Sequence, residues 1–276
     1  MADKPRFFQV EKDGPVIIWR FSNPPQNLWN NETAAEFNDV VEDLYEAPEL
    51  RVGILTSAVM EVFIQHFDVS LLVQWGDALK AGQITLPTER PAPRGVYRRG
   101  PKPVIAAINA PVAGGGLELC MACDFRFMSR AASVAQPEVG AGILPGGGGT
   151  QRMPRLIGLG RALELQLTGR PVFAEEAERI GLVTRACDPL NLMPEALEFA
   201  KILAAQPPLA VELIRRCIYE GTEMPLEEGL ALESELFRET LISGDALDRM
   251  RAYVASGQDA KQAQDLLKNF EQQDSE

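Results

Sequence analysis

Two glutamates, each beside a glycine-rich stretch, are the residues of this sequence whose setting is best suited to chemistry. Glu118 follows three consecutive glycines and is flanked by leucines, and Glu138 follows a proline ahead of a second glycine-rich segment, residues 140–149. A carboxyl group in apolar surroundings has a raised pKa and can act as an acid or a base near neutral pH. Two such groups could hold one water molecule between them.

The glycine triplet, Gly114, Gly115 and Gly116, is expected to open the helix that carries Glu118. It follows the short apolar run 104–108, which has the composition of a strand buried on both faces of a parallel sheet, although a buried helical segment would look similar. Glycine lets the backbone approach a ligand closely, and the first amides of a helix have no internal partner. The triplet can therefore direct N–H groups at a developing negative charge, or it can simply pack a helix tightly against a sheet.

The elements that must position these residues alternate between strands and helices, which indicates an α/β fold. Strands are expected at residues 7–11, 16–21, 52–56, 104–108, 125–128 and 182–186. Helices are expected at residues 32–45, 117–122, 161–167, 174–180, 193–205, 210–219 and 226–241, and a further helix after Thr150. Residues 70–103 are predicted to be irregular.

The end of this irregular stretch is rich in prolines and arginines. It contains Arg90, Arg94, Arg98 and Arg99. A surface loop or rim is expected here, either contacting a ligand or simply solvated.

Composition limits the function and the compartment. The net charge is −12, which argues against a general surface for nucleic acid or anionic membranes. No apolar run approaches membrane-spanning length, and the first residues resemble neither a signal nor a transit peptide. Four cysteines without a secretory signal suggest a reducing compartment, so a cytoplasmic protein is expected.

The sequence lacks the residues that several kinds of catalytic or binding site require. His66 is the only histidine, so a His-Glu-x-x-His zinc site is impossible and any serine triad would have to use it. The sequence contains no Gly-Lys-Ser/Thr phosphate loop and no third Rossmann glycine after Gly142. Cys120 and Cys123 have the spacing of half a zinc site but no second pair, so two core cysteines are favoured and no metal is predicted.

At this point the sequence resembles a known family. The run from Lys102 to Glu118, then Cys123-Asp124, Gln136-Pro-Glu138 and the run from Gly148 to Arg152, are similar to the crotonase superfamily, and most similar to enoyl-CoA hydratases. The match covers nearly the whole chain. The resemblance implies a spiral of repeated ββα units with a helical C-terminal region. It places a spiral core with the acyl-CoA site in residues 1–196, and an oligomerisation region, forming homotrimers or homohexamers, in residues 197–276.

The resemblance also implies roles for particular residues. Glu118 and Glu138 match the two glutamates that bind and activate water, and the backbone N–H groups of Phe67 and Gly115 match the oxyanion hole that polarises the thioester carbonyl. Substrate-binding residues are expected at His66, Asp68, Gly114 and Gly116. No cofactor is implied, because coenzyme A is part of the substrate.

The sequence departs from the family pattern at His66 and Phe67, which replace a usual Gly-Ala pair. The N–H of Phe67 survives such a replacement, so the ring is expected to act on the shape of the acyl pocket. His66 could reach ligand or pair with Asp68, but satisfaction by backbone is favoured. The basic residue that the family often places before Asn27 for the phosphates of coenzyme A is missing, and Arg98, Arg99, Lys102 or a neighbouring subunit could replace it.

The resulting prediction is an enoyl-CoA hydratase that adds water to a 2-enoyl-CoA thioester through an enolate-like state, in fatty acid metabolism. A Δ3,Δ2-enoyl-CoA isomerase needs only one of the two carboxylates, and another acyl-CoA lyase or hydrolase could use the unusual His66-Phe67 pair. From a different class, the chain could be a non-catalytic scaffold or an RNA-binding relative. Retention of both glutamates and the absence of a basic composition count against that alternative.

Overall fold

The computed structural model describes residues 6–85, 92–255 and 257. The chain divides into two compact units, one of Met1–Arg98 with Pro103–Ala200 and one of Arg99–Lys102 with Lys201–Glu276. The first unit holds all the strands within the described residues, and the second consists mainly of helices.

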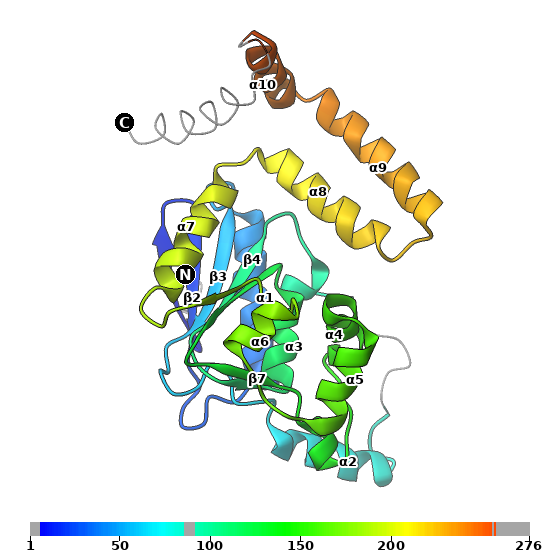
Figure 1. Ribbon diagram of the computed structural model, residues 1–276. Helices are drawn as coiled ribbons and strands as arrows, with labels where there is room; N and C mark the ends of the chain where they lie inside the picture. The colour runs from blue at the N-terminus through cyan, green and yellow to red at the C-terminus, as the bar shows by residue number, and fades with distance from the viewer. Residues whose placement is uncertain (1–5, 86–91, 256, 258–276) are drawn as a thin grey trace. The chain divides into compact units, whose positions relative to one another are not determined.

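A six-stranded sheet with the order β1-β2-β3-β4-β6-β9 runs through the first unit (Figure 1). Its strands are β1 (Phe8–Asp13), β2 (Val16–Phe21), β3 (Val52–Ser57), β4 (Val104–Ile108), β6 (Phe125–Ser129) and β9 (Arg185–Cys187). The first two form an antiparallel hairpin, and each later pair is parallel. Every residue of β3 and β4 is buried, as expected for parallel strands covered on both faces.

A smaller sheet leads the chain into the segments that carry the glycine triplet and Glu138. It has the order β5-β7-β8, formed by β5 (Val112–Ala113), β7 (Ser133–Ala135) and β8 (Val172–Phe173). Because β5 and β7 pair in parallel, the residues that follow each of them leave the same edge of the sheet. Gly114 comes directly after β5 and Gln136 directly after β7.

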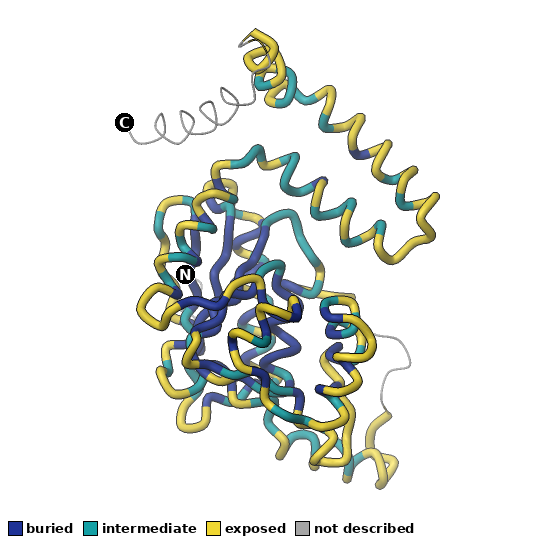
Figure 2. The backbone as a smooth tube through the Cα atoms, viewed as in Figure 1, coloured by how far each residue is buried: buried dark blue, intermediate teal, exposed yellow. Residues whose placement is uncertain are grey.

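The helices of the first unit cover these sheets and enclose an apolar core. They are α1 (Asn31–Glu46), α2 (Val69–Lys80), α3 (Gly115–Ala122), α4 (Gly149–Ile157), α5 (Leu159–Thr168) and α6 (Ala174–Arg179), and α7 (Leu192–Ala204) ends the unit. Strands β2, β3, β4 and β6 and helix α3 form its buried centre (Figure 2). The α/β fold of ββα units predicted from the sequence is confirmed.

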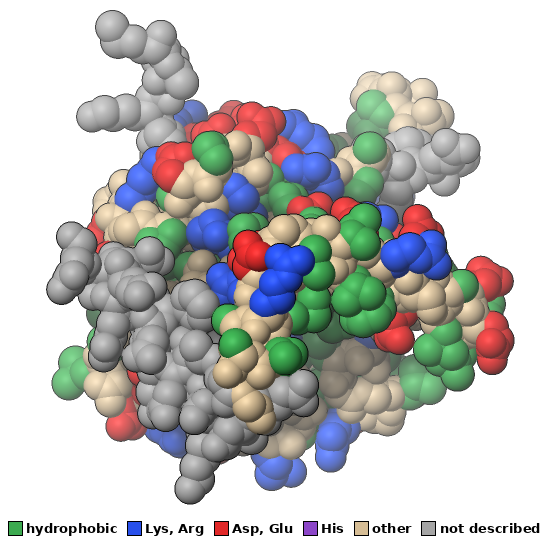
Figure 3. Space-filling view, turned by 90° about the horizontal axis from the view of Figure 1, so that it is seen from above, with side chains coloured by type: hydrophobic (Ala, Val, Ile, Leu, Met, Phe, Trp, Pro, Cys, Tyr) green, Lys and Arg blue, Asp and Glu red, His purple; other side chains and the backbone are tan. Residues whose placement is uncertain are grey.

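The second unit leaves much apolar surface uncovered within the single chain. Its helices are α8 (Pro208–Gly221), α9 (Leu226–Leu241) and α10 (Gly244–Ala255). Only Leu213 is buried in α8 and only Leu236 in α9, whereas Ile218, Phe237 and Ile242 are 58%, 61% and 73% exposed. On the face shown in Figure 3, Lys and Arg side chains are interspersed with Asp and Glu. No helix among the described residues is both long and apolar enough to cross a membrane.

The element predictions failed mainly in the stretch predicted to be irregular. Residues 69–80 form helix α2, and a short 3-10 turn, η1 (Gly95–Arg98), follows later. The prediction was wrong because the apolar residues of α2 do not face a core: none of them is buried. The two-residue and three-residue strands β5, β7 and β8 and the last helix α10 were missed, and β9 begins at Arg185, three residues later than expected. Residues 86–91, with Arg90, lie outside the described residues.

Candidate active site

Both glutamates line one cavity of about 530 Å³ in the first unit. His66, Phe67, Gly114 and Gly115 line the same cavity. The fold therefore brings together six of the eight residues predicted for the site, although they come from three separate stretches of the sequence.

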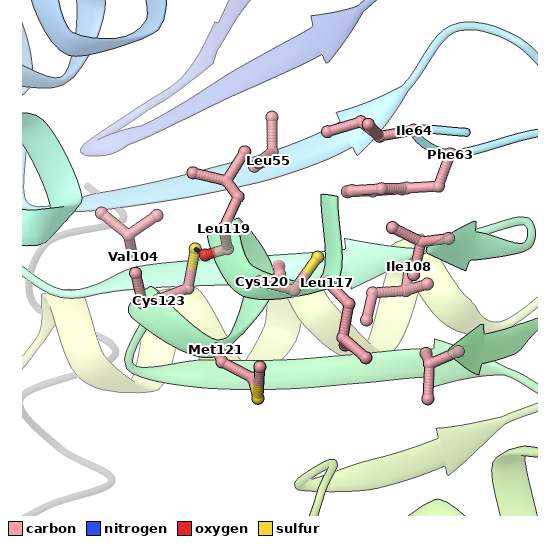
Figure 4. Packing of buried hydrophobic residues seen from close by; sticks show 14 of the residues in the cluster. Leu55, Phe63, Ile64, Val104, Ile108, Leu117, Leu119, Cys120, Met121 and Cys123 are labelled. Carbon is pink, nitrogen blue, oxygen red and sulfur yellow. Dashed lines mark hydrogen bonds between the residues drawn. The ribbon is translucent and has the colours of Figure 1, made fainter. Parts of the chain in front are cut away.

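Helix α3 holds Glu118 because it is buried on every side. All its residues from Gly116 to Ala122 are buried, and its apolar side chains pack among those of β3, β4 and the segment before α2 (Figure 4). Figure 4 labels Leu117, Leu119, Cys120, Met121 and Cys123 of this part of the chain among Leu55, Phe63, Ile64, Val104 and Ile108. The core role predicted for the two cysteines is confirmed, and burial raises the pKa of the Cys120 thiol to about 12.

The carboxylate of Glu118 is fixed by the second glycine-rich segment. Only 3% of the residue is exposed, and the N–H of Gly149, at the start of α4, donates a 2.6 Å hydrogen bond to its Oε1 atom. A Cβ atom at Gly147 would lie 2.5 Å from Oε2, so only glycine allows the backbone to approach the carboxylate this closely. Of the glycines in this segment, Gly147 and Gly149 are the two that lie against Glu118.

Glu138 lies in a more open setting, at the start of the short 3-10 turn η2 (Glu138–Ala141). Its Oε1 atom accepts a 3.3 Å hydrogen bond from Gln136, and its buried Oε2 atom has no partner among the described residues. Burial raises the pKa of Glu138 to about 7, and the nearby charge of Glu118 adds to the effect. This carboxyl can therefore exchange a proton near neutral pH.

The N–H groups of Phe67 and Gly115 are the second polar feature of the cavity. A Cβ atom at Gly115 would lie 3.6 Å from the backbone nitrogen of Phe67, which shows how closely the two residues approach. Neither N–H donates a hydrogen bond to any described residue. Unpaired backbone N–H groups away from bulk water are rare in folded proteins. Together the pair can donate to one oxygen atom of a ligand.

Gly114 shapes the backbone between these groups. Its φ of 53° and ψ of −128° favour glycine, and a Cβ atom there would lie 3.3 Å from Oε1 of Glu138. Its N–H donates to Ala135, and its carbonyl accepts from the side chain of Gln136. Gly114 thus links the turn before α3 to the segment that carries Glu138.

The other two predicted residues, Asp68 and Gly116, do not line the cavity. Asp68 caps α2, accepting hydrogen bonds from the backbone and hydroxyl of Ser70 at 2.9 and 2.7 Å. A Cβ atom at Gly116 would lie 2.7 Å from Ile64, so this glycine permits close packing. The structure shows roles in the scaffold for these two residues, and the substrate contacts expected for them stay a prediction.

His66 lines the cavity beside Gly114 but is already engaged with the backbone. Its Nδ1 atom lies 2.8 Å from the carbonyl oxygen of Phe67. Its Cβ atom lies next to Gly114. The bond to backbone is the arrangement favoured from the sequence, and no bond to Asp68 is formed.

An apolar wall that the sequence did not reveal completes the cavity. It consists of Phe67 and three residues of α2, namely Val69, Leu72 and Trp75. The rings of Phe67 and Trp75 lie 5.7 Å apart at an interplanar angle of 44°. The expected effect of Phe67 on pocket shape thus involves a second ring. The spacing of residues 69, 72 and 75 along one helical face was the available signal.

The two arginines considered for the phosphates of coenzyme A already have partners. Arg98 pairs with Glu42, and the guanidinium of Arg99 lies 4.1 Å from the ring centroid of Tyr219. Neither of them lines the cavity. In the described ranges, no group of three or more His, Cys, Asp or Glu residues is placed to hold a metal ion.

Comparison with known proteins identifies the family. A family model described as enoyl-CoA hydratase/isomerase matches residues 11–264. A short-chain-enoyl-CoA hydratase of Clostridium acetobutylicum is 36% identical over 249 residues, covering 89% of this chain and 93% of that protein. A crotonyl-CoA hydratase of Syntrophomonas wolfei is 33% identical over 249 residues, covering 89% and 94%.

Solved structures agree with this relationship. The crystal structure of an enoyl-CoA hydratase from Bacillus anthracis is similar with a TM-score of 0.79 and 30% identity, covering 91% of this chain and 97% of that one. The family model, the two relatives and the crystal structure each match nearly the whole chain. The match includes the motifs around Glu118 and Glu138. The chain therefore belongs to the enoyl-CoA hydratase/isomerase family of the crotonase superfamily.

Proposed function

We propose that this protein adds water across the double bond of a 2-enoyl-CoA thioester. One observation carries the proposal: two carboxyl groups and two unpaired N–H groups share a single cavity. Polarising a thioester needs hydrogen-bond donors, and adding water needs both a base and an acid. The family and the names of the relatives support the same activity.

In the proposed mechanism, the thioester oxygen accepts hydrogen bonds from the N–H groups of Phe67 and Gly115. Negative charge develops on this oxygen as water attacks C3, giving an enolate-like state. Donors that are already in place stabilise that charge without reorganising, and one such donor is typically worth about 3–4 kcal/mol.

The two glutamates then divide the proton transfers. Glu118, whose Oε1 atom accepts from Gly149, takes a proton from the attacking water as the new C3–O bond forms. Glu138, with its pKa near 7, donates a proton to C2 as the enolate collapses. Since both carboxyl groups act from one cavity, water and proton add to the same face of the double bond. The pair carries one proton before and after the reaction.

An isomerase that moves the double bond from C3 to C2 is the nearest competing function. Such a reaction needs only one carboxyl group to carry a proton between C4 and C2. The presence of Glu118 beside Glu138 in the cavity favours hydration. The decisive assay offers the protein 2-enoyl-CoA and 3-enoyl-CoA thioesters of several chain lengths and follows the enoyl absorbance. Its loss with 2-enoyl substrates supports hydration, and its appearance with 3-enoyl substrates alone supports isomerisation.

The helices of the second unit are proposed to join copies of the chain. Their exposed apolar residues exceed what the described part of one chain covers, which is typical of a surface buried on association. We expect light scattering to report a trimer or a hexamer. A monomer that remains fully active would contradict the oligomerisation role expected for residues 197–276.

A further inference from the structure

A tyrosine that the proposed mechanism does not use lines the catalytic cavity. Tyr97 lies in the 3-10 turn η1, and its side chain reaches the same cavity as Glu118, Glu138 and Gly115. Part of the residue packs against the main apolar core. The phenol is therefore anchored in the protein while it faces the place where substrate is proposed to bind.

The ring of Tyr97 is held by a residue that also supports the segment around Glu118. The guanidinium carbon of Arg152 lies 5.1 Å from the ring centroid, within the range of a cation–π contact. Arg152 also donates a 2.8 Å hydrogen bond to the carbonyl of Gly147, one of the two glycines that lie against Glu118. Tyr97, Arg152 and Gly147 thus form a connected support next to the catalytic carboxylate.

The hydroxyl group of Tyr97 makes no hydrogen bond with any residue that the structure describes. The residue is partly buried, and a phenol in such a position usually donates a hydrogen bond to protein or to water. Burial, together with the nearby charge of Glu118, raises the pKa of Tyr97 well above its ordinary value, so the phenol stays neutral and keeps its proton. It is therefore a donor without an acceptor among the described residues, in the cavity that both glutamates line.

We propose that Tyr97 is a third catalytic residue of the hydration reaction, whose hydroxyl donates a hydrogen bond to the attacking water beside Glu118. The inference rests on the hydratase function proposed above. The water uses its two protons toward the carboxyl groups and one lone pair toward C3, which leaves its second lone pair free to accept from Tyr97. The donor thereby fixes the direction of attack.

The proposal leaves the proton balance of the reaction unchanged. The O–H bond of Tyr97 is neither broken nor formed, because the phenol remains neutral throughout. The proton lost by water goes to Glu118, and the proton gained by C2 comes from Glu138. Tyr97 therefore contributes to adding water at C3, but not to the exchange of a proton at C2.

This difference defines the test. Tyr97→Phe removes the hydroxyl and keeps the ring under Arg152, so the fold is expected to be retained. Hydration of crotonyl-CoA should then lose about tenfold in kcat, the value of one neutral hydrogen bond at the upper end of its range, with KM changed less than twofold. Exchange of the C2 hydrogens of saturated butyryl-CoA in D2O, followed by mass spectrometry, should stay within twofold of wild type.

Tyr45→Phe is the matched control. Tyr45 is a buried tyrosine whose hydroxyl lies 3.4 Å from the carbonyl of Gly95, and it does not line the cavity. Its kcat should equal that of wild type. Unchanged kcat in Tyr97→Phe would overturn the inference, as would equal losses of hydration and C2 exchange, or a loss confined to some acyl groups. If wild-type protein hydrates no enoyl-CoA, the proposed function itself fails, and that outcome is distinct from all of these.

Discussion

The polar wall and the apolar wall of the cavity rest on parts of the fold that differ in burial. The polar wall, formed by Glu118, Glu138 and the N–H of Gly115, is centred on α3, whose residues from Gly116 onward are all buried. The apolar wall, defined above by Phe67 and the α2 residues, rests on a helix with no buried residue. The same cavity is thus bounded by the most and the least enclosed helices of the first unit.

We expect this difference in burial to separate the residues that determine the rate of the reaction from those that determine which acyl groups bind. Groups that carry charge or protons must be held within fractions of an ångström, and a close-packed core provides that precision. Side chains that only shape a pocket can be exchanged at little cost to the fold when they lie on an exposed helix. We therefore expect changes in the polar wall to affect rate, and changes in the apolar wall to affect selectivity.

The largest effect is expected from removing either carboxylate of the polar wall. Glu118→Gln and Glu138→Gln should each lower kcat for hydration by about 10²–10⁴-fold, because an amide can neither accept nor supply the transferred proton. Binding of a saturated acyl-CoA, measured by calorimetry, should persist in both variants.

Glu61→Gln, at an exposed position outside the cavity, provides the matched control and should hydrate substrate at the wild-type rate. If only the Glu138 variant loses activity, a single carboxyl group suffices and the isomerase function gains support. If both variants remain fully active, the two-carboxyl mechanism is wrong.

The next effect concerns pH and arises from the raised pKa of Glu138. The wild-type kcat/KM should fall about tenfold for each pH unit above pH 7, because the acid form of Glu138 disappears. Glu118 and Glu138 together carry one proton before and after the reaction. The rate of dehydration of a 3-hydroxyacyl-CoA should therefore also fall above pH 7. Rates for both directions, measured from pH 5 to 9, check this. A flat profile across pH 7 in both directions would show that this proton does not control turnover.

The free energy of unfolding should also depend on the ionisation of Glu138. The pKa of Glu138 is higher in the folded protein than its ordinary value of 4.5, so its contribution to stability is fully present below pH 4.5 and is lost as pH rises through about 7. The Glu138→Gln variant has a neutral amide at this position, so it does not lose this stability as pH rises. Its Tm relative to wild type should therefore increase between pH 5 and pH 8.

The two walls also differ in how far the sequence predicted them. The polar wall was found because Glu118 and Glu138 stand beside glycines, and glycine clusters mark places where a backbone must approach something closely. The parallel strands β3, β4 and β6 of the main sheet were predicted within a residue or two, since parallel buried strands have continuous apolar runs, whereas β5 and β7, which lead into these segments, are too short to show one.

The apolar wall was not predictable in the same way. Residues 69, 72 and 75 share one helical face, but this spacing does not distinguish a face turned to a cavity from one turned to a core, and none of the residues of α2 is buried. Tyr97 was missed for a related reason. Its part of the chain is rich in proline and arginine and looks like surface, and only the folded structure shows the phenol beside Glu118.

The smallest effect, and the one that tests the comparison most directly, is expected from the apolar wall. Phe67→Ala should change which acyl groups are accepted more than it changes the rate with the best substrate, because its N–H remains and only its ring is lost. Trp75→Ala, which removes the facing ring, should shift the ranking in the same direction. A single methylene in an apolar pocket is already worth about 1–3 kcal/mol of discrimination, so the loss of a ring is enough to reorder short, long and aryl enoyl-CoAs.

Val73→Ala is the matched control, because Val73 lies on α2 but is 58% exposed and does not line the cavity. It should leave the ranking of kcat/KM values unchanged. If Phe67 and Trp75 instead serve only the packing of the protein, their variants will lose several degrees of Tm and keep the wild-type ranking. That result would contradict the division between a wall for chemistry and a wall for selectivity. A reordered panel with Tm nearly unchanged would establish that the apolar wall of Phe67 and the α2 residues sets the acyl group, since only cavity-facing side chains of this wall would have been altered.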